Sequence, residues 1–139
     1  MPDNTVEARD IFENLADGES VTLKVQGVSM QPFLYNGRDT VTLKKNDKPV
    51  KRGDVVIFER GGIYLMHRIV EISADGYFTA LGDYSLTPET HIPLGNIKAV
   101  LVSAVRDGKT ITPKSPEWIF FSRIFINTSF RKLLKKGGK

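Results

Sequence analysis

The sequence predicts a mainly β protein, and three observations carry that prediction. Short stretches with apolar residues at alternating positions recur along the chain. Turn signals such as Asn36-Gly37, Asp75-Gly76 and Asp107-Gly108 separate these stretches. Apolar and charged residues make up 40% and 26% of the 139 residues, a composition typical of one soluble globular domain with a core. Closely spaced short strands of this kind indicate an antiparallel barrel or sandwich.

We expect strands where the alternation or a continuous apolar run is clearest. These cover residues 21–25, 40–44, 54–59, 63–72, 77–81, 97–105 and 110–112. Residues 82–96 break the pattern and contain Pro88 and Pro93, so we expect a loop there.

A helix is expected at each end of the chain. Residues 5–17 place apolar side chains at near-helical spacing, and Gly18 ends the pattern. Ser115-Pro116-Glu117 is a typical helix start, and the helix is expected to continue to about Lys136 with an apolar face and basic residues elsewhere. The chain is therefore divided into an N-terminal helix (1–18), a β domain (19–113) and a C-terminal amphipathic basic helix (114–139).

The positive charge is concentrated at the C-terminus. The net charge is +4, but residues 114–139 contain seven basic residues and one acidic residue, so the rest of the chain carries −2. A basic tail on an acidic body argues against a nucleic-acid-binding surface, and no nucleic acid is expected as a partner. The C-terminal helix has two interpretations: it packs on its own domain, or it lies on an anionic membrane surface.

Cysteine content and hydropathy restrict the other classes. The chain has no cysteine, which excludes disulfides, thiolate metal sites and a cysteine nucleophile. No apolar stretch approaches the roughly 18 residues that span a membrane, and the acidic N-terminus does not resemble a signal peptide. We therefore expect a cytoplasmic protein, peripheral on the inner membrane face if its C-terminal helix binds lipid.

A candidate nucleophile lies between residues 25 and 34. An alternating strand reaches Gly27, Ser29 follows two residues later, and Pro32 prevents the strand from continuing. A hydroxyl on such a corner can project from the sheet beside backbone N–H groups that are free to hold an oxyanion. The alternative is that Ser29 is an ordinary turn serine.

His67 is the candidate base for this serine. It lies on the apolar face of the strand expected at 63–72, where an imidazole needs either a hydrogen-bond partner or a chemical task. The alternative is a hydrogen-bonded core histidine, and His91 is interpreted as an exposed loop residue. Asp83 follows the strand next to that of His67, where its carboxylate can orient the imidazole. Taken alone, Asp83 is a turn residue.

Four segments, in this order, resemble the conserved boxes of the signal peptidase I group. They are residues 27–32 (Gly-Val-Ser-Met-Gln-Pro), 52–58 (Arg-Gly-Asp-Val-Val-Ile-Phe), 67–70 (His-Arg-Ile-Val) and 82–83 (Gly-Asp). The group shares a clan with the self-cleaving repressors of the SOS response and of phages. By this resemblance Ser29 matches the nucleophile. His67 stands where bacterial leader peptidases have a lysine and where archaeal and endoplasmic-reticulum enzymes have histidine, and Asp83 matches the aspartate of the latter branch.

The resemblance implies a pseudo-barrel of coiled antiparallel sheets and peptide hydrolysis without a metal or cofactor. Gly27, Met30, Pro32 and Phe33 are then the candidate residues around the oxyanion and the substrate. Met30 and Phe33 either wall a small apolar pocket or pack in the core.

This sequence departs from the family in three places. Its first residues do not predict the N-terminal membrane anchor that family members usually carry, Gly27 stands in place of a serine that often assists the oxyanion, and Tyr84-Ser85 stands in place of asparagines.

The expected function is that of a serine endopeptidase of signal peptidase type, acting through Ser29 and His67, with or without Asp83, on an extended peptide or leader sequence. The alternative is a regulatory or binding module that keeps the peptidase fold and cuts only itself, or nothing. The sequence does not identify the substrate.

Overall fold

The computed structural model describes residues 6–25, 29–45, 48–85 and 87–126. The prediction of a mainly β fold is confirmed, because this part of the chain forms one antiparallel sheet of eight strands and two short helices. The elements are α1 (Val6–Glu13), β1 (Ser20–Lys24), β2 (Asp39–Lys44), β3 (Val55–Arg60), β4 (Ile63–Ile72), β5 (Tyr77–Leu81), β6 (Glu89–Pro93), η1 (Leu94–Asn96, a 3-10 turn), β7 (Ile97–Arg106), β8 (Lys109–Ile111) and α2 (Pro116–Arg123).

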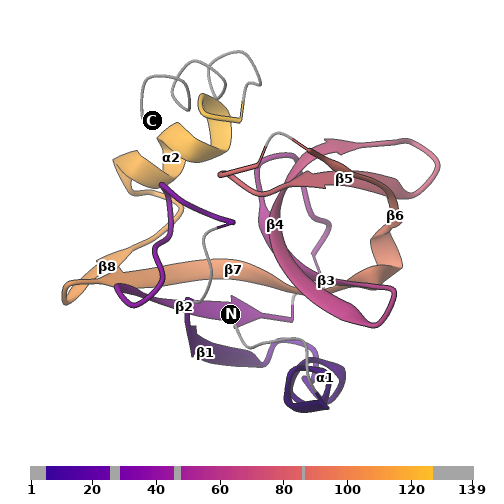
Figure 1. Cartoon of the computed structure of the whole chain (residues 1–139), viewed down its shortest axis with the longest axis horizontal. Helices are drawn as coiled ribbons and strands as arrows, with labels where there is room; N and C mark the ends of the chain where they lie inside the picture. Colours follow the sequence, from indigo (N-terminus) through magenta and orange to yellow (C-terminus); the bar gives the residue numbers. More distant parts are fainter. Residues whose placement is uncertain (1–5, 26–28, 46–47, 86, 127–139) are drawn as a thin grey trace.

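The sheet curls strongly but does not close into a barrel. Its strand order is β1-β2-β7-β3-β4-β5-β6, with β8 pairing with β7, so β1 and β6 are its two ends. Figure 1 shows that β3 to β6 wrap around into a curled half, while β1, β2, β7 and β8 form a flatter half. Side chains bridge the opening of the curled half. The Asn96 Nδ2 donates to the Glu59 carbonyl at 2.8 Å, and Arg60 forms an ion pair with Glu89 at 2.6 Å.

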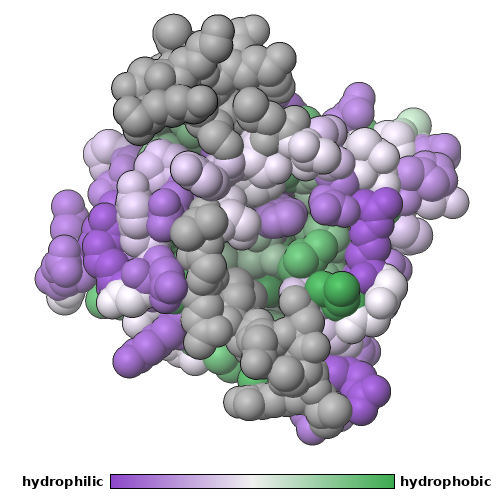
Figure 2. Space-filling model, in the orientation of Figure 1, coloured by the Kyte–Doolittle hydropathy of each residue, from purple (hydrophilic) through white to green (hydrophobic). Residues whose placement is uncertain are grey.

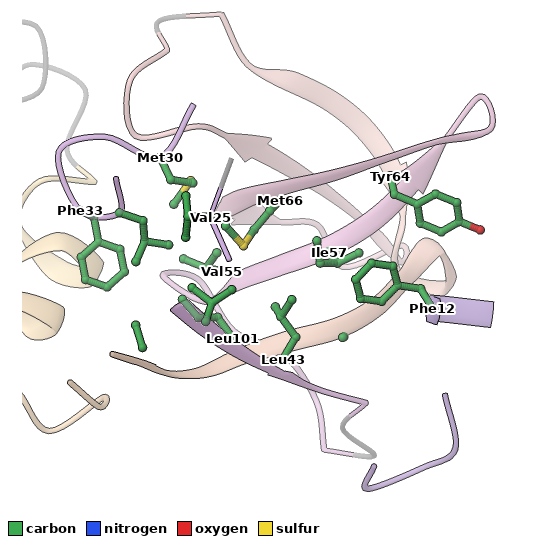
Figure 3. Packing of buried hydrophobic residues seen from close by; sticks show 14 of the residues in the cluster. Phe12, Val25, Met30, Phe33, Leu43, Val55, Ile57, Tyr64, Met66 and Leu101 are labelled. Carbon is green, nitrogen blue, oxygen red and sulfur yellow. The ribbon is translucent and has the colours of Figure 1, made fainter. Parts of the chain in front are cut away.

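The curling divides the core into two clusters. The larger cluster lies between the flatter half, the helices and one face of β3 and β4, and Figure 3 shows its packing. The smaller cluster lies on the other face of the same two strands, and its buried members are Val56, Phe58, Ile69, Phe78, Ala80, Ile92 and Val100. Because β3 and β4 are covered on both faces, the apolar run at 55–58 is continuous rather than alternating.

The expected loop at 82–96 is wrong in its second half, where Glu89–Pro93 forms strand β6. Only Ile92 is buried in this strand, so the stretch carries no alternating pattern. Pro93 is tolerated because β6 is an edge strand, which pairs with β5 alone and needs no second row of hydrogen bonds.

The second helix begins as predicted, with Pro116 in its first turn, but it ends at Arg123 instead of about Lys136. The N–H groups of Ile124 and Phe125 both donate to the Phe120 carbonyl, which ends the regular helical pattern. The predicted continuation after Ile126 lies outside the described residues. Within the described part of the chain, no helix has the length and hydropathy needed to span a membrane.

Candidate active site

Ser29 is exposed at the start of a turn that is hydrogen-bonded to the segment after β5. Its carbonyl accepts a hydrogen bond from the Tyr84 N–H at 3.0 Å, and the Leu34 N–H closes the turn on the Met30 carbonyl at 2.9 Å. In Figure 1 the chain after the grey 26–28 segment lies beside the end of β5. A residue that follows β1 is therefore held next to β4 and β5. Gly27, expected at the oxyanion, lies outside the described residues.

Gly82 lies next to both the Ser29 carbonyl and the His67 ring. A Cβ added to Gly82 would lie 2.5 Å from the Ser29 carbonyl oxygen, 3.2 Å from the His67 Cδ2 and 3.3 Å from the His67 Nε2. The Ser29 backbone and the Nε2 edge of the imidazole therefore contact the same glycine. The structure thus places the backbone of Ser29 and the ring of His67 near each other, although the two residues are far apart in the sequence. It also identifies Gly82 as a residue whose missing side chain makes this approach possible.

The environment of His67 favours a neutral imidazole. Burial lowers its pKa from the ordinary value of 6.5, and the negative charges of Glu89 and Asp83 act in the opposite direction. The ring packs against Phe58, with 6.0 Å between ring centroids. Among the described residues, Nδ1 has no hydrogen-bond partner although it is buried. A neutral imidazole can accept a proton, so His67 has the protonation state that a general base requires.

The structure corrects the expected position of Asp83, whose carboxylate binds Arg68 and does not orient the imidazole. The Arg68 Nε and Nη2 donate to its two oxygens at 2.8 and 2.7 Å, and both side chains are fully buried. Arg68 also donates to the Gly53 carbonyl at 2.9 Å. The physical reason is strand alternation: neighbouring residues 67 and 68 point to opposite faces of β4, and Asp83 lies on the face of Arg68.

Sequence reasoning missed Arg68. The available signal was a basic residue inside an apolar strand, which requires an acidic partner when it is buried. Its guanidinium also lies 5.1 Å from the centre of the Phe33 ring, and Phe33 in turn contacts Trp118 of α2, with 5.5 Å between ring centroids. The turn that carries Ser29 is therefore linked to β4 and to α2.

For Met30 and Phe33, the structure shows packing in the core. Their side chains are 2% and 0% exposed, and Figure 3 shows Met30 beside Val25 and Met66. Pro32 is exposed and remains accessible to a ligand. In the described parts of the chain, no three His, Asp or Glu side chains are grouped so that they could hold a metal ion.

Residues 3–81 match the model of a protein family described as Peptidase S24-like. The match covers more than half of the chain, includes Ser29 and His67, and ends just before Gly82. No curated protein matches the chain significantly.

Proposed function

The chain belongs to the Peptidase S24-like family, and from this premise we propose that it is a serine endopeptidase with Ser29 as nucleophile and His67 as general base. The observation that carries the proposal is that both residues lie next to Gly82, Ser29 with its backbone carbonyl and His67 with its Nε2 edge. The lowered pKa of His67 supports it, because a neutral base is available at neutral pH. The finer assignment, signal peptidase type with a histidine base, rests on the resemblance of the four sequence boxes.

In the proposed mechanism, the Ser29 Oγ attacks the scissile carbonyl carbon while the His67 Nε2 takes the hydroxyl proton. The carbonyl oxygen becomes an oxyanion that accepts a hydrogen bond from the Ser29 N–H. The imidazolium then gives its proton to the amide nitrogen as the C–N bond breaks, which leaves an ester on Ser29. Water, deprotonated by His67, attacks this ester, and the carboxyl product leaves as Ser29 recovers its proton.

The substrate is proposed to bind as an extended peptide beside the strand that leads to Ser29. β1 is an end of the sheet, so its outer edge can accept main-chain hydrogen bonds from an added strand. Figure 2 shows apolar side chains gathered over β3 and β4, with polar side chains around them. Such a surface, over the strand that carries His67, can contact apolar side chains of a bound peptide.

The test is cleavage of a complex peptide mixture, prepared by digesting a cell extract and analysed by mass spectrometry. We expect the full chain to generate new peptide ends at a shared sequence motif. Ser29→Ala and His67→Ala should generate none, while His91→Ala, which removes the exposed histidine, should retain activity. Cleavage that survives Ser29→Ala would refute the assignment.

Self-cleavage is the second candidate, and the docking of α1 argues against it for the N-terminal segment. Phe12 is buried and stacks on Tyr64, and Glu13 forms hydrogen bonds with Tyr64 and Lys98. Figure 1 places α1 well away from the end of β5, beside which Ser29 lies. Residues 6–13 would have to leave this position to reach Ser29. A fixed internal nick, found by mass spectrometry after alkaline incubation, would favour self-cleavage.

We also propose a peripheral contact of residues 114–139 with anionic lipid. The apolar face of α2 that contains Trp118 packs on the domain, but Ile119 of α2 and Ile124, the residue after the helix, are 38% and 48% exposed. The sequence after Ile126 contains five basic residues and no acidic one.

Co-sedimentation with phosphatidylglycerol vesicles tests the lipid contact. The double variant Ile119→Glu with Ile124→Glu should lose binding. Ile63→Glu, an equally exposed isoleucine at the start of β4, should keep it. Equal binding to neutral phosphatidylcholine vesicles would contradict the electrostatic part of the proposal.

A further inference from the structure

A second carboxylate, Glu89 of β6, lies on the same face of the sheet as the proposed base. Ile69 of β4 is directly opposite Ala80 of β5, and Ala80 is directly opposite Glu89. Residues directly opposite each other in antiparallel strands point to the same face. Ile69 and Ala80 belong to the smaller cluster, so Glu89 points to the face that this cluster occupies. His67, two residues before Ile69 on β4, points to this face as well.

Arg60 holds Glu89 in this position. The two side chains form an ion pair of 2.6 Å across the opening of the curled half. Arg60 follows Phe58 of the smaller cluster by two positions on β3, so it lies on the same face, at the end of the strand, where its side chain is 43% exposed. The other nearby charged pair, Arg68 with Asp83, lies on the opposite face of β4. Among these four charged residues, only Arg60 and Glu89 therefore share the face of His67.

A negative charge on this face would favour the proposed reaction, because the reaction places a positive charge on His67. His67 becomes an imidazolium each time it takes a proton, and it does so against Phe58 in an apolar environment. Asp83 is already bound on both oxygens by Arg68. Of the charges that raise the pKa of His67, that of Glu89 has the larger effect and that of Asp83 the smaller.

We propose that Glu89 is a positioning residue for His67: its carboxylate, held by Arg60, stabilises the imidazolium that forms during peptide hydrolysis. The inference rests on the proposed function of His67 as the base. It makes Glu89, in place of Asp83, the carboxylate that assists His67, although by its charge and not by orienting the ring, and it leaves Asp83 with a structural role. Arg60 fixes the direction of the carboxylate and moderates its charge.

Titration of the His67 ring by NMR tests the proposal without any need for turnover. The full chain is used, and the His67 signal is assigned by its loss in His67→Ala. We expect the titration midpoint of His67 to move to lower pH in Glu89→Gln and to higher pH in Arg60→Gln. Glu71→Gln, which removes the same charge from an exposed position of β4, should leave it unchanged. An unchanged midpoint in Glu89→Gln, or shifts of the same sign in both ion-pair variants, would overturn the inference.

The rate of peptide cleavage against pH supplies a second measurement. Glu89→Gln should move the rising limb of the profile to lower pH and lower kcat on the plateau, with KM unchanged. A purely structural role would instead lower the amount of folded enzyme and leave the position of the limb unchanged. If the wild-type chain cleaves no peptide, the proposed function fails, and the NMR titration still decides whether Glu89 acts on His67.

Discussion

The two faces of β4 surround neighbouring ionisable residues with different hydrogen-bond partners. Arg68 is fully buried, and its guanidinium is satisfied by the Asp83 carboxylate, by the Gly53 carbonyl and by the Phe33 ring. His67, one position earlier, directs its Nε2 edge toward Gly82 beside Ser29, while its buried Nδ1 has no hydrogen-bond partner among the described residues. A buried group whose hydrogen bonds are all made is typical of a structural role, and a buried ionisable group with an unpaired polar atom is a candidate for a chemical role.

We therefore predict that the two faces of this strand contribute separately, one to stability and the other to activity. Changes on the Arg68 face should act mainly on the free energy of unfolding. Changes on the His67 face should act mainly on the rate of peptide cleavage. The following predictions are ordered by expected effect, and each tests one side of this separation.

Loss of the base should have the largest effect. His67→Ala should lower kcat about 10²- to 10⁴-fold, the usual contribution of a general base, while the chain remains folded by circular dichroism. The cleavage rate is measured on a peptide found in the mixture described above. His91→Ala is the matched control and should behave like the wild type. Wild-type turnover by His67→Ala would remove the functional side of the comparison.

Breaking the buried ion pair should have the next largest effect, and it should act on stability. Arg68→Met leaves the Asp83 carboxylate buried without its partner and should lower the free energy of unfolding by about 3–5 kcal/mol, measured with urea. Replacing both residues, Arg68→Met with Asp83→Leu, should recover part of this loss because no buried charge remains. If the double variant were as unstable as the single one, the uncompensated charge would not be the cause.

Adding a methyl group at Gly82 should lower the rate of catalysis more than it lowers the stability of the fold. In Gly82→Ala the new Cβ would lie 2.5 Å from the Ser29 carbonyl oxygen, closer than real contacts allow, so Ser29 must move away. A displacement of this kind should lower kcat about 100-fold. Gly95→Ala is the control, because nothing lies within 4 Å of a Cβ at that position. Full activity of a folded Gly82→Ala would show that Ser29 and His67 need not meet there.

The smallest predicted effect concerns the pH dependence of stability. The pKa of His67 is below 6.5 in the folded chain and returns to that value on unfolding, so the unfolded chain binds more protons in the interval between the two. The free energy of unfolding should therefore rise with pH through this interval, by at most about 1.4 kcal/mol per pH unit, and not above it.

Two histidine variants locate the source of this pH dependence. Urea unfolding of His67→Gln at several pH values should show a smaller rise than the wild type, and His91→Gln should show the full rise. A rise that persists unchanged in His67→Gln would assign it to another group.

Much of the fold was predictable because its signals are local. The bounds of β4 and β5 match the expected strands at 63–72 and 77–81, since the Asp75-Gly76 turn and clear apolar runs mark them. β6 was not predictable, because a single buried residue, Ile92, cannot produce an alternating pattern of apolar residues. The curled but open sheet depends on contacts between distant residues, such as Asn96 with Glu59, that no local pattern contains.

The residue types of the candidate site were predictable from the sequence, but the side-chain pairs that these residues form were not. Ser29 and His67 were identifiable as candidates from a turn and from an imidazole within an apolar strand. The pairing of Asp83 with Arg68 depends on which face each side chain occupies, and one position along a strand reverses that face. Glu89 was missed because it lies in a stretch interpreted as a loop.

The most direct test of the central claim, that Ser29 is activated by His67, is covalent labelling of the full chain with a fluorophosphonate serine probe. Peptide mapping by mass spectrometry locates the adduct. We predict a single adduct on Ser29, which is absent in Ser29→Ala and formed far more slowly in His67→Ala. No adduct at Ser29 under conditions that label a known serine hydrolase, or labelling of Ser29 at the same rate without His67, would contradict the account.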